Sequence, residues 1–198
     1  ETSEAYWCAA GGTILAGQRA LGDGMAVNVG GGFHHAFPEH GEGFCAIHDV
    51  AIAIRRLQFD KAIATAMVVD TDVHQGNGTA EIFGGDGDIF TLSIHQENNY
   101  PYPKPASNID LHLPDGIGDA DYLAILEKHL IQAFHDFHPD VLFYVGGADP
   151  YMEDQLGGLR LTLEGLQRRD RLVFDHARRL GVPVAVTLAG GYARRVED

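Results

Sequence analysis

Three side chains that could bind a cation alternate in the segment VVDTDVHQGNG, where Asp70, Asp72 and His74 follow an apolar run. Alternate side chains of an extended segment point to the same side, so we expect these three groups to converge. Asp149, which follows another apolar run, supplies a further oxygen ligand. An unpaired carboxylate at the end of a buried strand is costly, and a metal ion neutralises it. Two Asp and one His leave one position of a tetrahedral zinc ion open, as in catalytic sites, although iron or a harder divalent ion also accepts such ligands.

Two other interpretations of this acidic segment are available. Residues 70–81 resemble a calcium loop, but Gln75 stands where the sharp turn needs Gly, and His74 stands where an oxygen is expected. Alternatively, Asp70 and Asp72 are N-caps of a following helix. The N-cap interpretation leaves His74 unexplained.

Two further motifs contain groups suited to proton transfer. In GGGFHHA, His34 and His35 follow three glycines at the end of an apolar run. A single histidine is more often structural, but an adjacent pair in such a loop suits acid–base chemistry near neutral pH. Tyr192 follows Gly190 and Gly191; its phenol either donates to a developing oxyanion or packs at a strand end.

The elements that must position these residues alternate between apolar strands and amphipathic helices. We expect strands at 25–29, 61–69, 88–94, 141–145 and 183–188, helices at 4–21, 49–57, 119–137 and 162–180, and an irregular stretch over 96–118. Asp119 and Thr162 are the expected N-caps, and Gly181 is the expected stop. This alternation predicts the α/β class, with a mostly parallel sheet between two helical layers. Ligands bind such sheets beyond the carboxyl ends of the strands, where the residues above fall.

Composition excludes several classes of protein. The chain has 198 residues, 45% of them hydrophobic and 21% charged, which predicts a single folded domain over residues 1–198. A net charge of −14 opposes binding to nucleic acid or to an anionic membrane, and it favours a cationic substrate. The segment 76–78 is not expected to bind phosphate, because no Lys follows it and acids lie beside it. Cys8 and Cys45 form no C-x-x-C pair, which fits a reducing, cytoplasmic setting, and no apolar run is long enough to span a membrane. The sequence does not indicate an oligomeric state.

Four motifs occur in order along the chain: GGGFHHAFPEHGEGFCAIHDVAIA, VVDTDVHQGNGTAEIF, GGADPYMEDQLGGLRLT and LAGGY. Together they resemble the histone deacetylase superfamily, which includes acetylpolyamine amidohydrolases and acetoin-utilisation proteins. The HQGNG variant is most similar to the class IV branch and its bacterial relatives. The family's usual N-terminal segment and the portion after the Gly-Gly-Tyr are missing from the sequence, which predicts a partial catalytic domain.

The resemblance implies an arginase-like three-layer α/β/α fold and the removal of an acetyl or longer acyl group from acyl-lysine, with one zinc ion per chain. The zinc ligands it implies are Asp72, His74 and Asp149. The catalytic groups it implies are His34 oriented by Asp70, His35 beside it, and Tyr192 as the group that polarises the carbonyl.

The resemblance also implies surrounding sites. The substrate tunnel it implies contains Gly43, Phe44, Tyr100, Gly190 and Gly191. A structural potassium ion is implied among Asp70, Asp72, His74, Ser93 and Ile94. Asn77 stands where many relatives have a second carboxylate behind the tandem histidines, so we expect His35 to be held less strongly as imidazolium.

Three alternative functions remain open. An acetylpolyamine amidohydrolase would use the same site on a smaller cationic substrate. A two-metal ureohydrolase of the arginase type needs more carboxylates, and Asp149 has no second aspartate two residues away. A non-catalytic domain that binds acyl-lysine is the third alternative.

Overall fold

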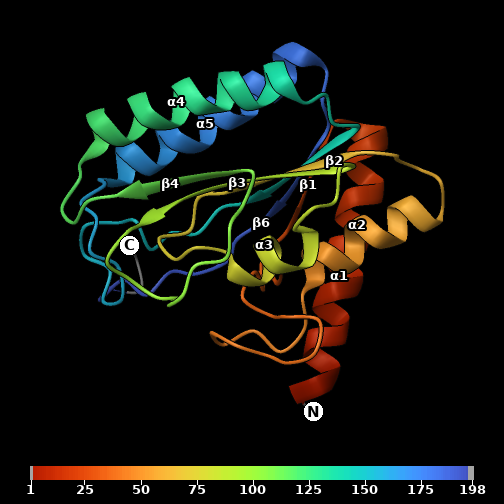
Figure 1. Ribbon diagram of the computed structural model, residues 1–198, viewed down its shortest axis with the longest axis horizontal. Helices are drawn as coiled ribbons and strands as arrows, with labels where there is room; N and C mark the ends of the chain where they lie inside the picture. The colour runs from red at the N-terminus through yellow and green to blue at the C-terminus, as the bar shows by residue number, and fades with distance from the viewer. Residues whose placement is uncertain (1, 196–198) are drawn as a thin grey trace.

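The computed structural model describes residues 2–195, and its centre is a parallel sheet with strand order β1-β6-β5-β2-β3-β4 (Figure 1). The strands are β1 (Met25–Asn28), β2 (Ala66–Asp70), β3 (Ile89–Gln96), β4 (Ile109–Leu113), β5 (Val141–Val145) and β6 (Val184–Thr187). The helices are α1 (Thr2–Asp23), α2 (Asp49–Phe59), α3 (Asn77–Phe83), α4 (Asp119–Asp136) and α5 (Leu163–Leu180). The predicted α/β class with a parallel sheet is confirmed.

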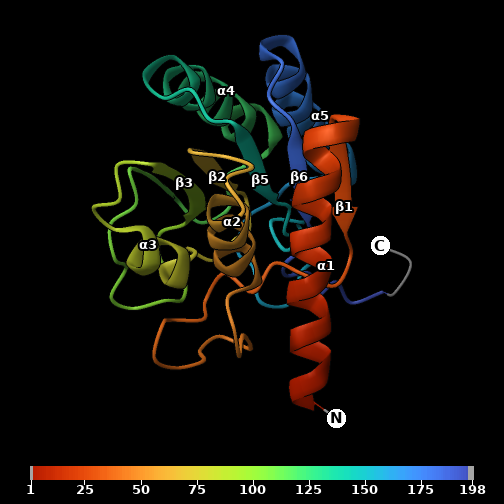
Figure 2. The same cartoon turned by 90° about the vertical axis from the view of Figure 1, so that its right-hand side faces the viewer.

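Helices cover both faces of the sheet, with α4 and α5 on one face and α1, α2 and α3 on the other (Figures 1 and 2). Alternate residues of β2 enter the two resulting cores: Met67 and Val69 pack under α4 and α5, whereas Ala66 and Val68 pack under α1 and α2. A strand buried on both faces needs apolar residues at every position, which explains its continuous apolar run. None of the described helices is long and apolar enough to cross a membrane.

The ends of α5 follow the predicted capping pattern, but the start of α4 does not. Thr162 accepts a hydrogen bond from the Gly165 N–H at 2.9 Å, and Gly181 is left-handed with φ 71°. The prediction that Asp119 caps α4 is wrong, because the N-cap is Gly118 and no side chain bonds there. Asp119 lies in the first turn instead, where its carboxylate accepts from the backbone and hydroxyl of Thr162.

Other boundaries also differ from the expected ones. The strand expected over 61–69 begins only at Ala66, because the Ala64 and Thr65 N–H groups donate to the Asp140 carboxylate outside the sheet. The stretch 96–118, expected to be irregular, contains β4 at the sheet edge; its mixed polar sequence IDLHL lacks an apolar run. Helix α3 is not among the expected helices; the alternative interpretation placed a helix after Asp70 and Asp72, but the N-cap of α3 is Gly76, so neither aspartate caps it.

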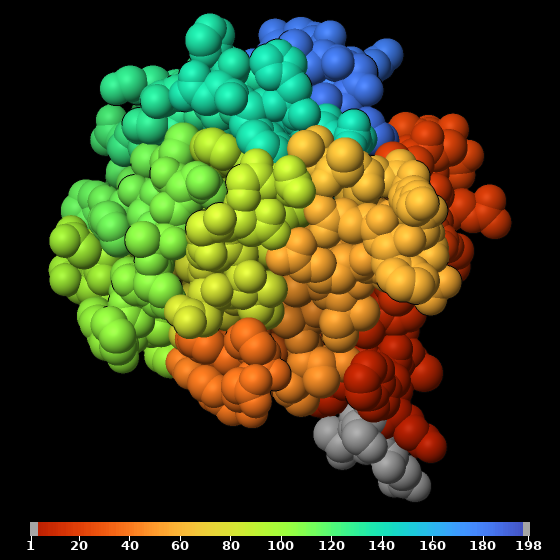
Figure 3. Space-filling view, turned by 45° about the vertical axis from the view of Figure 1, so that its right-hand side comes forward, coloured from red at the N-terminus to blue at the C-terminus, as the bar shows by residue number. Residues whose placement is uncertain are grey.

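The carboxyl ends of the strands and the loops that follow them lie at one edge of the sheet (Figure 1). Figure 3 shows that the segment near residue 40 (orange) lies against the segment near residues 75–90 (yellow to yellow-green). A backbone hydrogen bond from Thr79 N to His34 O, at 3.1 Å, joins the same two parts of the chain. The loop between β1 and α2 (residues 29–48) therefore lies against the segment that follows β2, and its His34 contacts Asp70 at the end of that strand.

Candidate active site and metal centre

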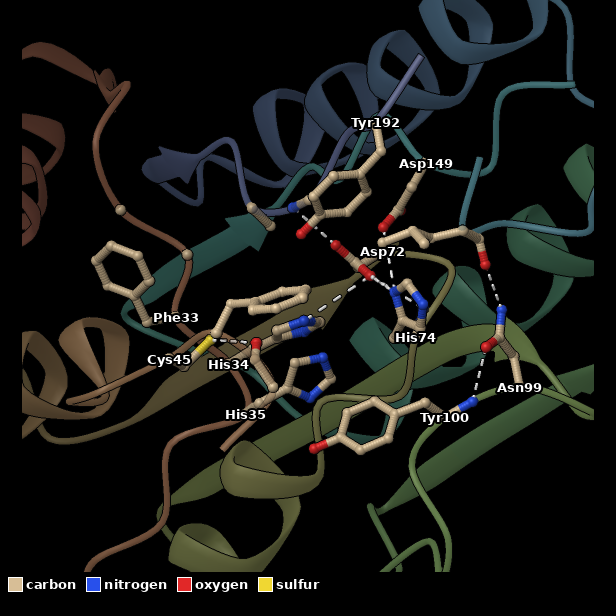
Figure 4. Close-up of a pocket in the computed structure, with 17 residues that line it drawn as sticks. Phe33, His34, His35, Cys45, Asp72, His74, Asn99, Tyr100, Asp149 and Tyr192 are labelled. Carbon is tan, nitrogen blue, oxygen red and sulfur yellow. Dashed lines mark hydrogen bonds and ion pairs between the residues drawn. The ribbon is translucent and has the colours of Figure 1, made fainter. Parts of the chain in front are cut away.

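Most of the predicted site residues lie around one cavity of about 420 Å³ at the carboxyl ends of the strands (Figure 4). The predicted residues that line it are His34, His35, Gly43, Phe44, Asp72, His74, Tyr100, Asp149, Gly190 and Tyr192. Gly191, Asp70, Asn77, Ser93 and Ile94 do not line it. Phe33, Cys45, Asn99 and Leu156 line the cavity although the sequence analysis did not select them. Phe33 and Cys45 belong to the first of the four motifs and Leu156 to the third, whereas Asn99 lies outside all of them.

Asp72, His74 and Asp149 meet at the floor of this cavity. Each offers one ligand atom, and these atoms all lie within 4.8 Å of one another. His74 Nδ1 lies 3.1 Å from Asp72 Oδ1 and 3.2 Å from Asp149 Oδ2, so this nitrogen faces both carboxylates. Among the described residues, no other group of three or more His, Cys, Asp and Glu side chains meets the same criterion.

The chain brings these ligands together by a bend rather than by strand alternation. Strand β2 ends at Asp70, and residues 71–76 are not extended, so the period-two argument for their convergence is wrong. Hydrogen bonds hold the bend instead: Asp70 Oδ1 accepts from the Asp72 N–H at 3.1 Å, and Asp149 Oδ1 accepts from the Val73 N–H at 2.8 Å.

The donor set fits a divalent cation. Asp149 is fully buried, and its Oδ2 makes no well-aligned hydrogen bond among the described residues, although His74 Nδ1 lies 3.2 Å away. Burial, together with the charge of Asp72, raises the pKa of the Asp149 carboxyl to about 7. Gly190 completes the cradle: its N–H donates to Asp72 Oδ2 at 2.9 Å, and a Cβ there would lie 2.4 Å from Asp149 Oδ2. A cation between the two carboxylates would satisfy the orphaned oxygen and relieve their repulsion.

The tandem histidines have different environments. His34 Nδ1 lies 2.6 Å from Asp70 Oδ2, as expected, whereas His35 Nδ1 lies 2.7 Å from the neutral Asn77 Oδ1. Burial opposes a charge on His34, but the carboxylates of Asp70 and Asp72 outweigh it and raise the pKa of His34 to about 9. Burial and the neighbouring His34 charge lower the pKa of His35 to about 2. The pair therefore combines a cationic His34 ring with a neutral His35 ring.

Two aromatic residues border the cavity above the histidines. Burial, followed by the charges of Asp72 and Asp149, raises the pKa of the Tyr192 phenol to about 12, so it stays a hydrogen-bond donor. Its backbone is fixed, because the Tyr192 N–H donates to Asp154 Oδ2 at 2.6 Å. Phe44 is 79% exposed at the rim, with its ring centroid 6.4 Å from that of Tyr192.

Arg169, on α5, is a residue that the sequence analysis missed. It is 2% exposed, and its Nη1 donates to the Gly147 carbonyl at 2.6 Å and to the Thr71 carbonyl at 3.2 Å. These carbonyls precede Asp72 and Asp149 closely in the chain. Arg169 therefore joins the two loops that carry the carboxylates. The amphipathic pattern of α5 did not indicate that this Arg faces inward.

Of the residues predicted to bind potassium, Asp72 and His74 line the cavity, whereas Asp70, Ser93 and Ile94 do not. Asp70 and Ser93 are register partners at the ends of β2 and β3, and Ile94 follows Ser93. The Ser93 hydroxyl lies 2.9 Å from His95 Nδ1. Potassium binding here stays a prediction.

Comparison with known proteins places the chain among similar sequences and folds. The family model described as the histone deacetylase domain matches residues 1–197. An uncharacterised protein from Picosynechococcus is 47% identical over 190 residues, which cover 96% of this chain and 63% of that protein. An HDAC homolog from Aquifex aeolicus has a similar structure, with a TM-score of 0.83 and 30% identity over 93% of this chain and 52% of that chain. An acetylpolyamine aminohydrolase from Burkholderia pseudomallei follows with a TM-score of 0.79 and 27% identity, over 93% of this chain and 56% of that chain. The chain thus spans less than two thirds of the length of each of these proteins.

Proposed function

The chain belongs to the histone deacetylase family, and from this membership we propose that it is a zinc-dependent amidohydrolase that removes an acetyl or longer acyl group from acyl-lysine in a protein or peptide. The observation that carries the proposal is the convergence of Asp72, His74 and Asp149 beside the tandem histidines in one cavity. This arrangement combines a cation site with groups that can move protons, which is what hydrolysis of an amide requires.

Asp72, His74 through Nδ1, and Asp149 would hold the zinc ion. When bound there, zinc supplies a Lewis acid that polarises the amide carbonyl and makes hydroxide available near neutral pH. Three protein ligands leave a coordination position open, as catalytic sites require.

His35 is the proton carrier in this proposal. Its Nδ1 is engaged by Asn77, which leaves Nε2 to take a proton from the attacking water and to return it to the leaving lysine amine. His34, held by Asp70 and positively charged, stabilises the negative charge that develops beside it. The Tyr192 phenol donates a hydrogen bond to the oxyanion, a contribution worth about 10²–10³ in rate in other enzymes.

The cavity walls suit a long, narrow substrate arm. Phe44 and Tyr100 flank the opening, and both line the cavity together with Gly43 and Gly190. Aromatic walls can contact the methylene stem of an acylated lysine, which carries no charge once its amine is acylated. The net charge of −14 draws the remaining cationic residues of a basic peptide toward the protein.

Mass spectrometry of acid release tests the proposal. The protein is incubated with an acetyl-lysine peptide, a long-chain acyl-lysine peptide and an acetylated polyamine, with zinc and with a chelator. We expect release from an acyl-lysine peptide that needs zinc and is lost in Asp72→Asn. Asp121→Asn, the same change at an exposed position on α4, is the matched control and should keep full activity. Release that persists in Asp72→Asn would refute the proposed site.

A second candidate function, hydrolysis of acetylated polyamines, is supported by the structural similarity to the Burkholderia enzyme. Release from the polyamine alone would favour it. Folded, zinc-loaded protein that binds acyl-lysine but releases no acid would favour a binding domain instead. A zinc content near one ion per chain would argue against the two-metal ureohydrolase, and the single candidate cluster in the described residues points the same way.

A further inference from the structure

The amide of Asn77 lies between His35 and a carboxylate. Its Oδ1 is 2.7 Å from His35 Nδ1, and its Nδ2 is 2.9 Å from Glu42 Oε1. A carboxylate can only accept a hydrogen bond, so the Asn77 atom that faces Glu42 must be the Nδ2 donor. Oδ1 then faces His35 and can only accept. His35 must therefore carry its proton on Nδ1, which leaves the lone pair on Nε2.

The same carboxylate oxygen also holds Tyr100, whose hydroxyl donates to Glu42 Oε1. The Tyr100 ring stands edge-on to the His35 ring, with the centroids 4.9 Å apart. The hydrogen bond from Tyr100 holds the pKa of the Glu42 carboxyl below its usual value, so Glu42 is ionised near neutral pH. Glu42 Oε1 thus accepts hydrogen bonds from both Asn77, the partner of His35, and Tyr100, the aromatic residue beside His35.

A tight hairpin fixes Glu42 in this position. The backbones of Glu42 and Cys45 exchange two hydrogen bonds, of 2.9 and 2.7 Å. Gly43, between them, has φ 52°, and a Cβ at this position would lie 2.4 Å from His35 Cδ2. Only glycine lets the hairpin rest on the histidine ring, so the location of the Glu42 carboxylate is tied to that of His35.

Building on the proposed function, we propose that Glu42 is a positioning residue that acts through Asn77 to hold His35 in the Nδ1-protonated tautomer. Position 77 lacks the carboxylate that the family resemblance leads one to expect, and Glu42 supplies this charge one side chain further away. With Nε2 unprotonated, His35 accepts a proton from water there, becomes imidazolium, and gives the same proton to the leaving amine.

Glu42→Gln tests the proposal because it preserves shape but lets the side chain donate as well as accept. Asn77 can then reverse, so that Nδ2 faces His35 Nδ1 and the ring proton moves to Nε2. In the zinc-loaded protein we expect kcat on the preferred acyl substrate to fall by about tenfold, the lower end of the effect of losing an outer partner at such sites, while KM changes little. Glu39→Gln, at an exposed position in the same loop, is the matched control and should leave kcat unchanged.

The double variant separates positioning from folding. Asn77→Asp places a carboxylate directly against His35 Nδ1, so Glu42 is no longer needed to orient the amide. We expect Glu42→Gln to alter kcat by less than about twofold in the Asn77→Asp background. An equal loss of kcat in both backgrounds would overturn the proposal, as would a single Glu42→Gln variant with unchanged kcat.

Nitrogen-15 NMR of the histidine rings provides a readout that does not depend on turnover. In wild-type protein we expect a protonated Nδ1 and an unprotonated Nε2 for His35, assigned through the signals lost in His35→Ala. In Glu42→Gln we expect the Nε2-protonated form to appear. If wild type releases no acid from any substrate, the proposed function fails, yet the ring tautomer still decides the role of Glu42: an unchanged ring in Glu42→Gln overturns that role.

Discussion

Replacing Asp149 by Asn should abolish metal binding and, at the same time, make the metal-free protein more stable. Asp149 is fully buried, and its Oδ1 accepts from the Val73 N–H at 2.8 Å, while its Oδ2 makes no well-aligned hydrogen bond in the described part of the chain and lies 3.2 Å from His74 Nδ1. Asn keeps the first acceptor and replaces the orphaned oxygen by an NH₂ group. That group can donate to the carboxylate of Asp72, which removes a like-charge contact.

The stabilisation expected in Asp149→Asn follows from the pKa shift of the Asp149 carboxyl in the wild-type protein. Its pKa rises from 3.8 to about 7 in the folded protein, a difference of about three pH units or about 4 kcal/mol at 1.36 kcal/mol per unit. The free-energy cost of ionising Asp149 in the folded protein is absent below about pH 4, where the carboxyl is protonated in both the folded and the unfolded state. The cost is complete above about pH 7. The metal-free wild type should therefore lose stability across this pH range. At pH 8 we expect Asp149→Asn to be more stable by roughly 2–4 kcal/mol, because Asn does not titrate.

Urea unfolding at pH 8, with a chelator and with zinc, measures both effects. A ligand at one hundred times its Kd stabilises the folded state by about 2.7 kcal/mol. Wild type should gain about this amount with zinc, and Asp149→Asn should gain almost none. Asp121→Asn, at an exposed position, should match wild type under both conditions. A metal-free Asp149→Asn less stable than wild type would refute the reasoning, because it would show that neighbouring histidines already compensate the buried charge.

Three further substitutions have defined outcomes. Tyr192→Phe should lower kcat by about 10²–10³ while zinc content, measured by atomic emission, stays at the wild-type level; unchanged kcat would remove the phenol from the mechanism. Gly190→Ala should weaken zinc binding in titration calorimetry and cost about 1–3 kcal/mol in urea unfolding, because its Cβ would lie 2.7 Å from Asp72 Oδ2. Arg169→Met should cost about 1–3 kcal/mol for each buried carbonyl that loses its donor, those of Gly147 and Thr71; a total cost below about 1 kcal/mol would show that the guanidinium is not needed there.

The sequence allowed the sheet and the metal cluster to be predicted for different reasons. The strands β2 and β5 are buried on both faces, so their apolar runs are visible without any partner. Strand β4 lies at the edge with a mixed pattern, and its pairing with β3 is a property of the sheet rather than of its own residues. The convergence of Asp72 and His74 was expected, but from strand geometry that the bend after Asp70 does not have.

The proposed role of Glu42 could not be predicted from the sequence, because it depends on contacts between distant parts of the chain. Glu42 and Asn77 are 35 residues apart, and Glu42 and Tyr100 are 58 apart. In the sequence, Asn77 stands where the family resemblance leads one to expect a carboxylate behind His35. In the folded protein, the Glu42 carboxylate lies on the side of Asn77 that faces away from His35. The composition of the loop that contains Glu42 does not indicate this contact.

Arg169 links the metal centre to the stability of the fold. It donates to the carbonyls of Gly147 and Thr71, and so fixes the relative position of the loops that carry Asp149 and Asp72. The candidate ligand atoms already lie within 4.8 Å of one another with this brace in place. Little backbone ordering is then left for the metal to induce, and its contribution to stability must come mainly from neutralising charge. For this reason the change of one oxygen to nitrogen at Asp149 should reproduce much of the stabilisation by zinc while removing the site itself.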